Sequence, residues 1–542
     1  MFKTGVALCS TVFSFAVLSG ALLSSDFCQA QQVPLPSPKA TQSPSLPSIE
    51  TQNAIKGLSV DPLPRRTQSV PLREYKIDKD QLPAGSAGRL KLDDQGNAST
   101  PLLVPNTVVL QFEPTASKAD IDDLLRKRGL TVVDTYPALG AVKAEGDLSK
   151  YFAPTLNDRT ANDALLRGLT RVIDDFKSEP IVRSATPDVV LTTKAEPPLI
   201  ANLIKAADVA PITIAAGETE KLDWGIEDIE ADKLWTLDGA FDGALFGVMD
   251  VGFLRHEDIT FLELAGGIEV DDHGNHVAGI ACARHGNGKG VRGVIPNCFV
   301  RAKTADVFFT SAGGNPTLGF LVVFSQILAT FDRFLSEYTD LKVINLSMGY
   351  NWRSNFGINP DAAESDQWRK LVEAQGVFLV SVLELANKSG KVIVSAAGND
   401  SAPSATAITA KYASPFNWAA ITAREKNIRN GVIVEAHDQN KKRAYFSNSG
   451  GHISCPGVNV LSTVAKDANG NVSNAMYGTM SGTSMASPYC ASALVLLGLV
   501  RPGYTGVELI DCMVASSDKT DAGTPMLKLT QAIGKCPPKL NQ

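Results

Sequence analysis

Uninterrupted runs of apolar residues in the second half of the chain predict the core of an α/β domain. Residues 244–249 and 392–396 have the length and the apolar character of strands that are buried on both faces. Residues 485–500 are mostly Ala, Leu, Val and other small residues and predict a buried helix, and residues 277–283 form a shorter run of the same kind. Such strands are typical of parallel sheets that helices cover on both faces.

The pattern before residue 222 predicts separate segments. A lysine near the start, an apolar run over residues 6–23 and a plausible cleavage site at its end predict a secretory signal over residues 1–30. Residues 31–101 are rich in Pro, Ser and Gln, which predicts a disordered linker. We therefore expect an exported chain, secreted or periplasmic, with no membrane span once the signal is removed.

Residues 102–192 alternate strand and helix patterns in the order β-α-β-β-α-β, which predicts a small ferredoxin-like sandwich. The elements are expected near residues 107–112, 117–129, 130–133, 141–143, 160–176 and 181–191. Residues 193–221 have no strong period, as a connector would. The remaining residues, 222–542, are enough for one large α/β domain.

Four polar residues stand at the ends of the apolar runs. Asp250 directly follows the first predicted strand, His273 precedes residues 277–283, Asn399 follows the second strand, and Ser484 precedes the predicted helix. A helix that begins beside Ser484 would aim free N–H groups at it. Each residue alone is more typical of a turn, a cap or a satisfied polar side chain. Their chain order is Asp, His, Asn, Ser.

Together with its local motifs, this order resembles the subtilisin-like serine peptidases (subtilases) over about residues 222–530. The order excludes the α/β-hydrolase and chymotrypsin arrangements. Further segments that resemble family signatures lie at 224–227, 344–349, 446–450 and 456–458. The resemblance implies a subtilisin-like, doubly wound and mostly parallel sheet with helices on both faces, preceded by a small α+β ferredoxin-like prodomain.

The resemblance implies a serine endopeptidase that forms an acyl-enzyme on Ser484. His273 would take the hydroxyl proton and return it to the leaving amine, because serine is a poor nucleophile without a base. Asp250 would hold the imidazole tautomer and stabilise the imidazolium. The Ser484 N–H and the Asn399 amide would meet the oxyanion. His276, the second histidine of the motif, would pack behind the first.

Two segments resemble the walls of the family's primary specificity pocket, and they consist of Ser347, Met348, Gly349, Ala396, Ala397 and Gly398. Residues this small leave backbone edges open to an extended peptide, which would add as a strand. Asp400 follows the predicted oxyanion asparagine. It lies either at the pocket rim, where it would favour polar or basic side chains, or in a solvated turn.

A structural calcium site is also implied by the resemblance. Asp258 would supply a carboxylate and Asn287, in a glycine-rich loop, an amide oxygen, because calcium prefers six to eight oxygen ligands. Lys289 places a cation in the same loop. No cofactor is expected for catalysis.

Subtilases commonly carry a prodomain of the shape predicted for residues 102–192, which chaperones and inhibits the catalytic domain until it is cleaved. We therefore expect a self-processing zymogen with its own prodomain as intramolecular inhibitor and a cleavable connector at 193–221. The alternative is a permanent accessory domain that binds another molecule.

Six cysteines remain after removal of the signal, and an even number in an exported chain suggests up to three disulfides. Sequence alone leaves 15 connectivities open. Short separations favour Cys282 with Cys298 and Cys512 with Cys536, which leaves Cys455 for Cys490, and buried free thiols remain an alternative.

The net charge of −6 provides no basic patch for nucleic acid. We expect a monomer whose partners are polypeptide substrates and its own prodomain. The alternative function is a catalytically silent subtilase fold that serves as a binding or scaffold protein. The complete set of Asp250, His273, Asn399 and Ser484 argues against that alternative.

Overall fold

The computed structural model describes residues 46–60, 103–153, 155, 161–192, 220–237, 241, 243–250, 252–265, 272–304, 306–307, 321–353, 357–401, 406–466, 472–516 and 518–539. The predicted signal at 1–30 and nearly all of the predicted connector at 193–221 lie outside these residues.

A seven-stranded sheet forms the centre of the C-terminal part. Its strand order is β13-β12-β11-β10-β5-β7-β6, and every neighbouring pair is parallel. The predicted α/β fold with a mostly parallel sheet is confirmed. The strands are β5 (Ala244–Asp250), β6 (Phe261–Ala265), β7 (Cys298–Thr304), β10 (Val343–Leu346), β11 (Val392–Ala396), β12 (Gly431–His437) and β13 (Ile453–Pro456).

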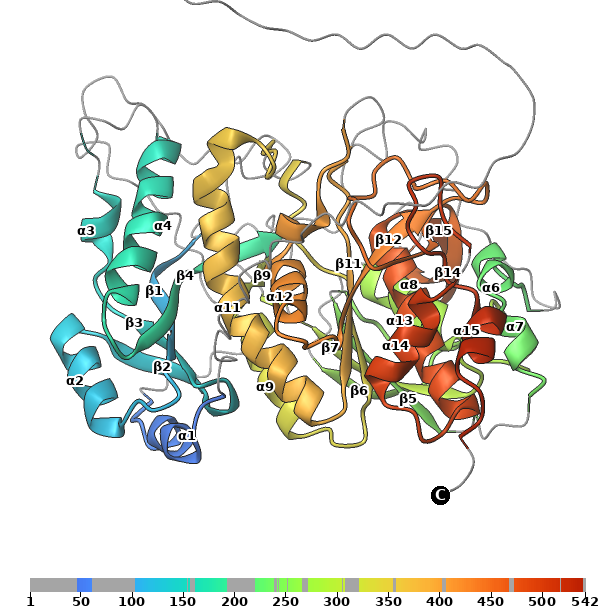
Figure 1. Cartoon of the computed structure of the whole chain (residues 1–542), viewed down its shortest axis with the longest axis horizontal. Helices are drawn as coiled ribbons and strands as arrows, with labels where there is room; N and C mark the ends of the chain where they lie inside the picture. The colour runs from blue at the N-terminus through green and yellow to red at the C-terminus, as the bar shows by residue number, and fades with distance from the viewer. Residues whose placement is uncertain are drawn as a thin grey trace, which may run out of the picture. The chain divides into compact units, whose positions relative to one another are not determined.

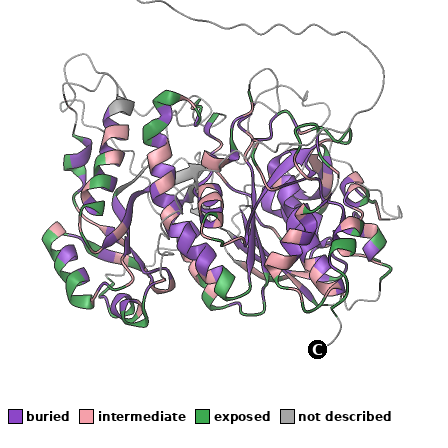
Figure 2. Ribbon diagram, viewed as in Figure 1, coloured by how far each residue is buried: buried purple, intermediate pink, exposed green. Residues whose placement is uncertain are grey.

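Helices cover both faces of this sheet (Figure 1). One face carries α8 (His273–Cys282) and α13 (Thr483–Val500), and the other carries α9 (Phe324–Ser336), α11 (Asp366–Lys388) and α12 (Pro415–Arg424). Alternate residues of a strand enter different cores, since Val394 packs with the first group of helices and Ile393 with the second. Strands β5, β10, β11, β12 and β13 are accordingly almost entirely buried (Figure 2), which explains the continuous apolar runs, whereas the edge strand β6 exposes Leu262.

The strand order reverses between β5 and β10. From β5 the sheet continues to β7 and β6, and from β10 it continues to β11, β12 and β13. Open α/β sheets bind ligands beyond the carboxyl ends of the strands at such a reversal. Asp250 ends β5 and Ser347 follows β10, so both residues lie at this edge of the sheet.

The N-terminal module has the predicted β-α-β-β-α-β order. Its antiparallel strands are arranged as β2-β3-β1-β4. The first helix begins with a capping box of Ser117 and Asp120 and ends at Gly129, whose φ of 62° favours glycine. The elements are β1 (Leu103–Phe112), α2 (Lys118–Arg128), β2 (Thr131–Tyr136), η2 (Pro137–Leu139), β3 (Ala141–Glu145), α3 (Ser149–Phe152), α4 (Ala161–Lys177) and β4 (Val182–Thr192).

The sheet of the N-terminal module extends into the C-terminal part. Strand β4 pairs with β9 (Leu321–Val323), and β9 pairs with β8 (Asp306–Val307). Asp188 of β4 accepts hydrogen bonds from the Ser325 N–H at 2.9 Å and hydroxyl at 2.6 Å, and forms an ion pair with Lys143 at 3.0 Å. Because Ser325 lies in the first turn of α9, the module supplies a carboxylate to the N-terminus of that helix.

The prediction of a disordered linker over residues 31–101 is wrong for α1 (Ile49–Lys56). Ser48 caps this helix, and Ile55 is buried in the same apolar core as the module. The buried Thr51 hydroxyl donates to the Pro114 and Ala116 carbonyls. The buried apolar residues of α1 and the hydrogen bonds of Thr51 stabilise this helix, although the sequence around it has the composition of a linker.

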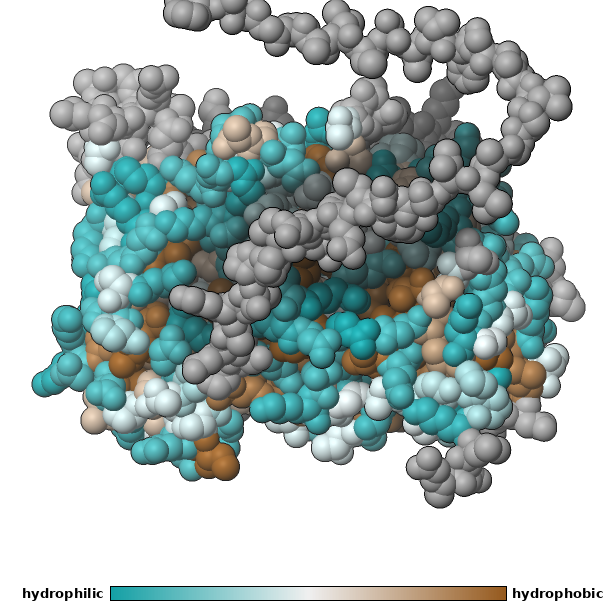
Figure 3. All heavy atoms as spheres, in the orientation of Figure 1, coloured by the Kyte–Doolittle hydropathy of each residue, from teal (hydrophilic) through white to brown (hydrophobic). Residues whose placement is uncertain are grey.

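The other elements surround the sheet. Helix α13 is 18 residues long with a mean hydropathy of 1.5, enough to cross a membrane, and 78% of it is buried here. The face of the described part seen in Figure 3 is mainly hydrophilic, with small apolar patches. The remaining elements are α6 (Trp224–Asp228), α7 (Ala231–Leu234), η3 (Ala363–Ser365), η4 (Ala410–Tyr412), β14 (Val460–Lys466), β15 (Val472–Met480), α14 (Gly506–Val514) and α15 (Leu529–Lys535).

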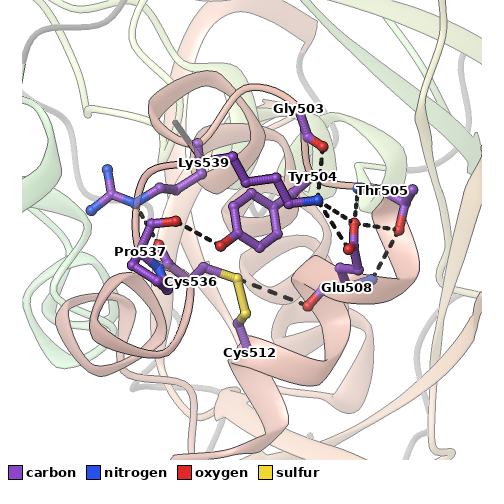
Figure 4. The surroundings of a disulfide bond; sticks show 9 residues. Gly503, Tyr504, Thr505, Glu508, Cys512, Cys536, Pro537 and Lys539 are labelled. Carbon is purple, nitrogen blue, oxygen red and sulfur yellow. Dashed lines mark hydrogen bonds and ion pairs between the residues drawn. A yellow bond between two sulfur atoms is a disulfide. The ribbon is translucent and has the colours of Figure 1, made fainter. Parts of the chain in front are cut away.

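Two of the three predicted cysteine pairings are found. The Cα atoms of Cys282 and Cys298 are 5.3 Å apart and those of Cys512 and Cys536 are 5.9 Å apart, and both pairs form disulfides. The second disulfide joins α14 to the segment after α15 (Figure 4). Beside it, Lys539 Nζ lies 3.0 Å from Glu508, so the C-terminal segment is held at two points.

The third predicted pairing is wrong in this structure. Cys455 on β13 and Cys490 on α13 are both buried free thiols. Burial, followed by the hydrogen bond with Cys490, raises the pKa of the Cys455 thiol well above its usual range. The two side chains meet across the interface of sheet and helix as thiols that pack in an apolar core.

Candidate active site

The predicted aspartate and histidine are in direct contact. Asp250 is the last residue of β5, and His273 is the first residue of α8. His273 Nδ1 lies 2.6 Å from Asp250 Oδ1, and the Asp250 side chain is fully buried. A carboxylate in this position accepts the Nδ1 proton, so the Nε2 atom is left as the basic position of the ring.

The second histidine of the motif is turned away from that pair. His276 Nε2 lies 3.0 Å from the Val460 carbonyl and 3.1 Å from the Gly478 carbonyl, so it donates to the β14–β15 hairpin. Burial, with a smaller contribution from the charge of His273, lowers the pKa of His276 to about 3. His276 is therefore a neutral structural residue, which leaves His273 as the candidate base.

The predicted serine and asparagine are brought to the same edge of the sheet. Ser484 is the second residue of α13, which packs against α8. The Asn399 Oδ1 atom accepts hydrogen bonds from the Thr483 N–H at 2.9 Å and from the Thr483 hydroxyl at 2.8 Å. Thr483 thereby fixes which way the amide of Asn399 faces, with its oxygen engaged and its NH₂ group directed elsewhere.

The two predicted oxyanion donors converge on one small space. A Cβ atom built on Gly482 would lie 3.4 Å from Asn399 Nδ2 and 3.6 Å from the Ser484 backbone N. Gly482 has no side chain, so this space beside the serine stays open. Two nitrogen donors this close to one position are the arrangement that binding the single oxygen of a tetrahedral intermediate requires.

The six predicted substrate-binding residues follow neighbouring strands. Strands β10 and β11 are parallel and adjacent, so the segments that begin at Ser347 and at Ala396 lie side by side. At Gly398 the φ of 101° favours glycine, and a Cβ there would lie 2.5 Å from the Asn448 amide. The backbone of Gly349 also has a close neighbour, because a Cβ there would lie 3.0 Å from the Ala413 carbonyl oxygen.

The prediction that Asp400 lies at a pocket rim or in a solvated turn is wrong, because its side chain is 1% exposed. One carboxylate oxygen accepts the Arg353 N–H at 2.9 Å, and the other accepts from the Asn448 amide at 3.2 Å. Burial raises the pKa of Asp400 to about 6. Asp400 therefore supports the loop behind Asn399 and does not contact substrate.

Sequence analysis missed the supporting residues Thr483 and Asn448. Thr483 holds the Asn399 amide, and Asn448 holds Asp400. Both residues lie inside segments that resemble family motifs, and that position was the available signal.

The predicted calcium ligands lie together but bind each other. The Asn287 amide donates to Asp258 Oδ1 at 2.6 Å, and the Val291 N–H lies 3.3 Å from Asp258 Oδ2. The Asn287 oxygen accepts the Lys289 N–H at 2.9 Å. The loop therefore presents donors where calcium needs six to eight oxygens, so these residues do not fit the ion. Among the described residues, no three His, Cys, Asp or Glu side chains are grouped to hold a metal.

Removing divalent cations with EGTA is therefore expected to leave the thermal unfolding midpoint unchanged. A metal that binds only the folded state stabilises it by mass action, so a calcium site would give a lower midpoint in chelator. The measurement is calorimetry of one preparation with EGTA and with added calcium. A midpoint several degrees higher with calcium would show that the Asp258–Asn287 pair opens to bind the ion.

Comparisons with known proteins bear on the family of the chain. Residues 267–534 match the model of the subtilase family. Asp250 lies before this range, so its place in the site depends on the 2.6 Å contact with His273.

Several curated proteases are similar to the chain. The minor extracellular protease Epr of Bacillus subtilis strain 168 is 25% identical over 68% of this chain and 50% of its own length. The thermophilic serine proteinase of Bacillus sp. strain AK1 is 27% identical over 55% of this chain and 62% of its own length. Subtilisin Savinase of Lederbergia lenta is 26% identical over 54% of this chain and 89% of its own length. The chain thus spans between half and two thirds of the first two relatives.

Proposed function

Since this chain belongs to the subtilase family of serine peptidases, we propose that it is an exported serine endopeptidase that is made as a self-processing zymogen. The observation that carries the activity is the convergence of Asn399 Nδ2 and the Ser484 N–H on the open space beside Gly482. The Asp250–His273 pair at the same edge of the sheet supplies the base.

In the proposed acylation, the Ser484 oxygen attacks the scissile carbonyl carbon while its proton moves to His273 Nε2. Asp250 keeps the Nδ1–H tautomer and stabilises the imidazolium. The carbonyl oxygen becomes an oxyanion held by Asn399 and the Ser484 N–H. The intermediate collapses with cleavage of the C–N bond, and His273 gives its proton to the leaving amine. Water then repeats the cycle on the ester and releases the acid.

The proposed substrate is an extended polypeptide segment. Apart from Met348, the segments at the carboxyl ends of β10 and β11 consist of small residues, among them Ser347, Gly349 and Ala396. Small side chains leave backbone N–H and C=O groups open for pairing with an added strand. This recognition is largely independent of substrate sequence, as suits a peptidase of broad specificity.

The proposed inhibitory role of the N-terminal module is supported by its contacts. Its last strand, β4, pairs with β9, which leads directly into α9. Gln111 donates to the Ser381 hydroxyl at 2.9 Å, and the Ser184 hydroxyl donates to the Ala374 carbonyl of α11 at 2.8 Å. Buried polar contacts of this kind hold one orientation, which a folding template and inhibitor requires.

Export is supported by the apolar N-terminal run and by similarity to a protease named as extracellular. The two disulfides agree with an oxidising compartment. We propose that the mature enzyme needs no cofactor for catalysis and acts as a monomer.

The experiment that tests the activity is hydrolysis of an unfolded polypeptide by the purified, processed chain. Cleavage within the polypeptide, at many positions, is the expected result. A catalytically silent subtilase fold would bind the same polypeptide without cleaving it, so size analysis of the products separates the two functions.

A further inference from the structure

The carbonyl of Ser484 has an unusual environment for a residue near a helix start. In an α-helix this carbonyl would accept from the N–H four residues later, and that residue is Pro488, which has no N–H. Pro488 lies beyond the first turn, whose N–H groups have no partner in any helix. The proline at this position therefore removes the regular helical donor to the Ser484 carbonyl.

A hydroxyl from the neighbouring strand segment takes the place of that donor. Ser347 Oγ donates to the Ser484 carbonyl at 3.0 Å. In the other direction, the Ser484 hydroxyl lies 3.5 Å from the Ser347 carbonyl. The nucleophile is thus tied by its own backbone to the segment that follows β10, the predicted wall of the substrate site.

The Ser347 hydroxyl is itself oriented by a buried amide. Asn345 in β10 donates from Nδ2 to Ser347 Oγ at 2.9 Å, so the hydroxyl proton of Ser347 is free to point at Ser484. Asn345 Oδ1 accepts from the Ser487 hydroxyl at 2.7 Å. Asn345 and Ser487 are fully buried, and Ser347 is 5% exposed.

These bonds form a closed ring between strand and helix. It runs from Ser484 through one helical turn to Ser487, then to Asn345, to Ser347 and back to the Ser484 carbonyl. The hydrogen bonds all run in the same donor-to-acceptor direction, from the Ser487 hydroxyl to the Ser484 carbonyl. Strand β10, which carries Asn345, is a central strand of the sheet. A ring of this kind fixes the backbone of the nucleophile relative to a central strand of the sheet.

We propose that Asn345, Ser347 and Ser487 are positioning residues, which hold Ser484 in register with the bound substrate by tying its carbonyl to the strand segment instead of to its own helix. This inference rests on the proposed peptidase function. A displacement of the nucleophile by about 1 Å costs about 100-fold in rate, so the ring acts on kcat. The side chain of Ser347 contacts the enzyme backbone, so its loss leaves KM little changed.

The test is steady-state kinetics of Ser347→Ala and Ser487→Ala with a peptide substrate. Ser347→Ala is expected to lower kcat by about 10- to 100-fold with KM within about twofold, and Ser347→Thr, which keeps a hydroxyl, to retain most of the rate. Ser487→Ala, remote from substrate, is expected to lower kcat several-fold in the same way. An unchanged kcat in both alanine variants, or a raised KM with kcat unchanged, would overturn the proposal.

Two further variants distinguish a role of the ring in positioning Ser484 from a role in stability alone. Asn430→Ala removes a buried asparagine that donates to the Leu383 and Lys391 carbonyls, away from the site, and is expected to lower stability without changing kcat. Pro488→Ala in the Ser347→Ala background returns a helical N–H to the Ser484 carbonyl. The proposal predicts that stability recovers and kcat does not, and recovery of kcat would show that the carbonyl merely needs a donor.

The failure of this inference is distinguishable from failure of the proposed function. A wild-type chain without turnover contradicts the peptidase function, and the inference with it. A wild-type chain that turns over, with Ser347→Ala and Ser487→Ala variants of equal kcat, contradicts only the positioning role.

Discussion

Replacing Ser484 by alanine is expected to abolish peptide hydrolysis and also release of the N-terminal module. This substitution removes only the hydroxyl group. In the proposed mechanism, peptide hydrolysis and release of the N-terminal module use that hydroxyl as the same nucleophile. The expected loss in kcat is about 10⁶-fold, a magnitude known for the serine of subtilisin. Electrophoresis and mass determination of the exported chain would report the unprocessed length, while the wild type would report a shorter one.

A matched serine in the same helix provides the control. Ser492 is buried in α13, and its hydroxyl donates to the Pro488 and Tyr489 carbonyls within the helix. Ser492→Ala is expected to process normally and to keep its kcat. Correct processing of Ser484→Ala, expressed without another protease, would refute self-cleavage, and residual hydrolysis at the wild-type rate would refute the nucleophile.

Replacing Asn399 by leucine is expected to lower kcat by about 100- to 1000-fold with little change in KM. In the proposed mechanism, the Asn399 amide and the Ser484 N–H bind an oxyanion whose charge exists only in the transition state. Loss of the Asn399 amide therefore leaves the binding of the ground-state substrate intact. Leucine has a similar size and no donor. Kinetics over a range of substrate concentrations separate the two constants.

The same variant has a second measurable consequence. Thr483 loses the oxygen that now accepts its N–H and its hydroxyl, at 2.9 and 2.8 Å, so stability is expected to fall by about 1–3 kcal/mol. Unfolding in denaturant measures this separately from kcat. A higher KM at constant kcat would instead make Asn399 a substrate contact.

The fold could be predicted because its elements have strong local signals, whereas the candidate site residues are singled out only by the joint order of their four motifs. The parallel strands are apolar on both faces, and Ser117 and Gly129 mark the ends of one helix in the N-terminal module. Asp250 and His273 are 23 residues apart in sequence and meet at 2.6 Å, as the order of their motifs predicts.

Features that depend on tertiary contacts could not be predicted in this way. Asp400 is followed by Ser, Ala and Pro, which are typical of a turn, but contacts with Arg353 and Asn448 bury it. Helix α1 lies within a proline-rich segment and is stabilised by contacts with residues more than 60 positions away. Asp258 and Asn287 are residue types that often bind calcium. Only the hydrogen bond from the Asn287 amide to the Asp258 carboxylate shows that the two side chains bind each other.

The central claim is that Ser484 is an activated nucleophile, and labelling with a fluorophosphonate tests it most directly. The probe reacts with serine hydroxyls that a neighbouring base activates. We expect one modified residue per chain, Ser484, identified by peptide mass spectrometry, with labelling abolished in His273→Ala and in denatured protein. An intact wild-type chain in which Ser484 stays unmodified would contradict the account and would leave a subtilase fold that binds without catalysis.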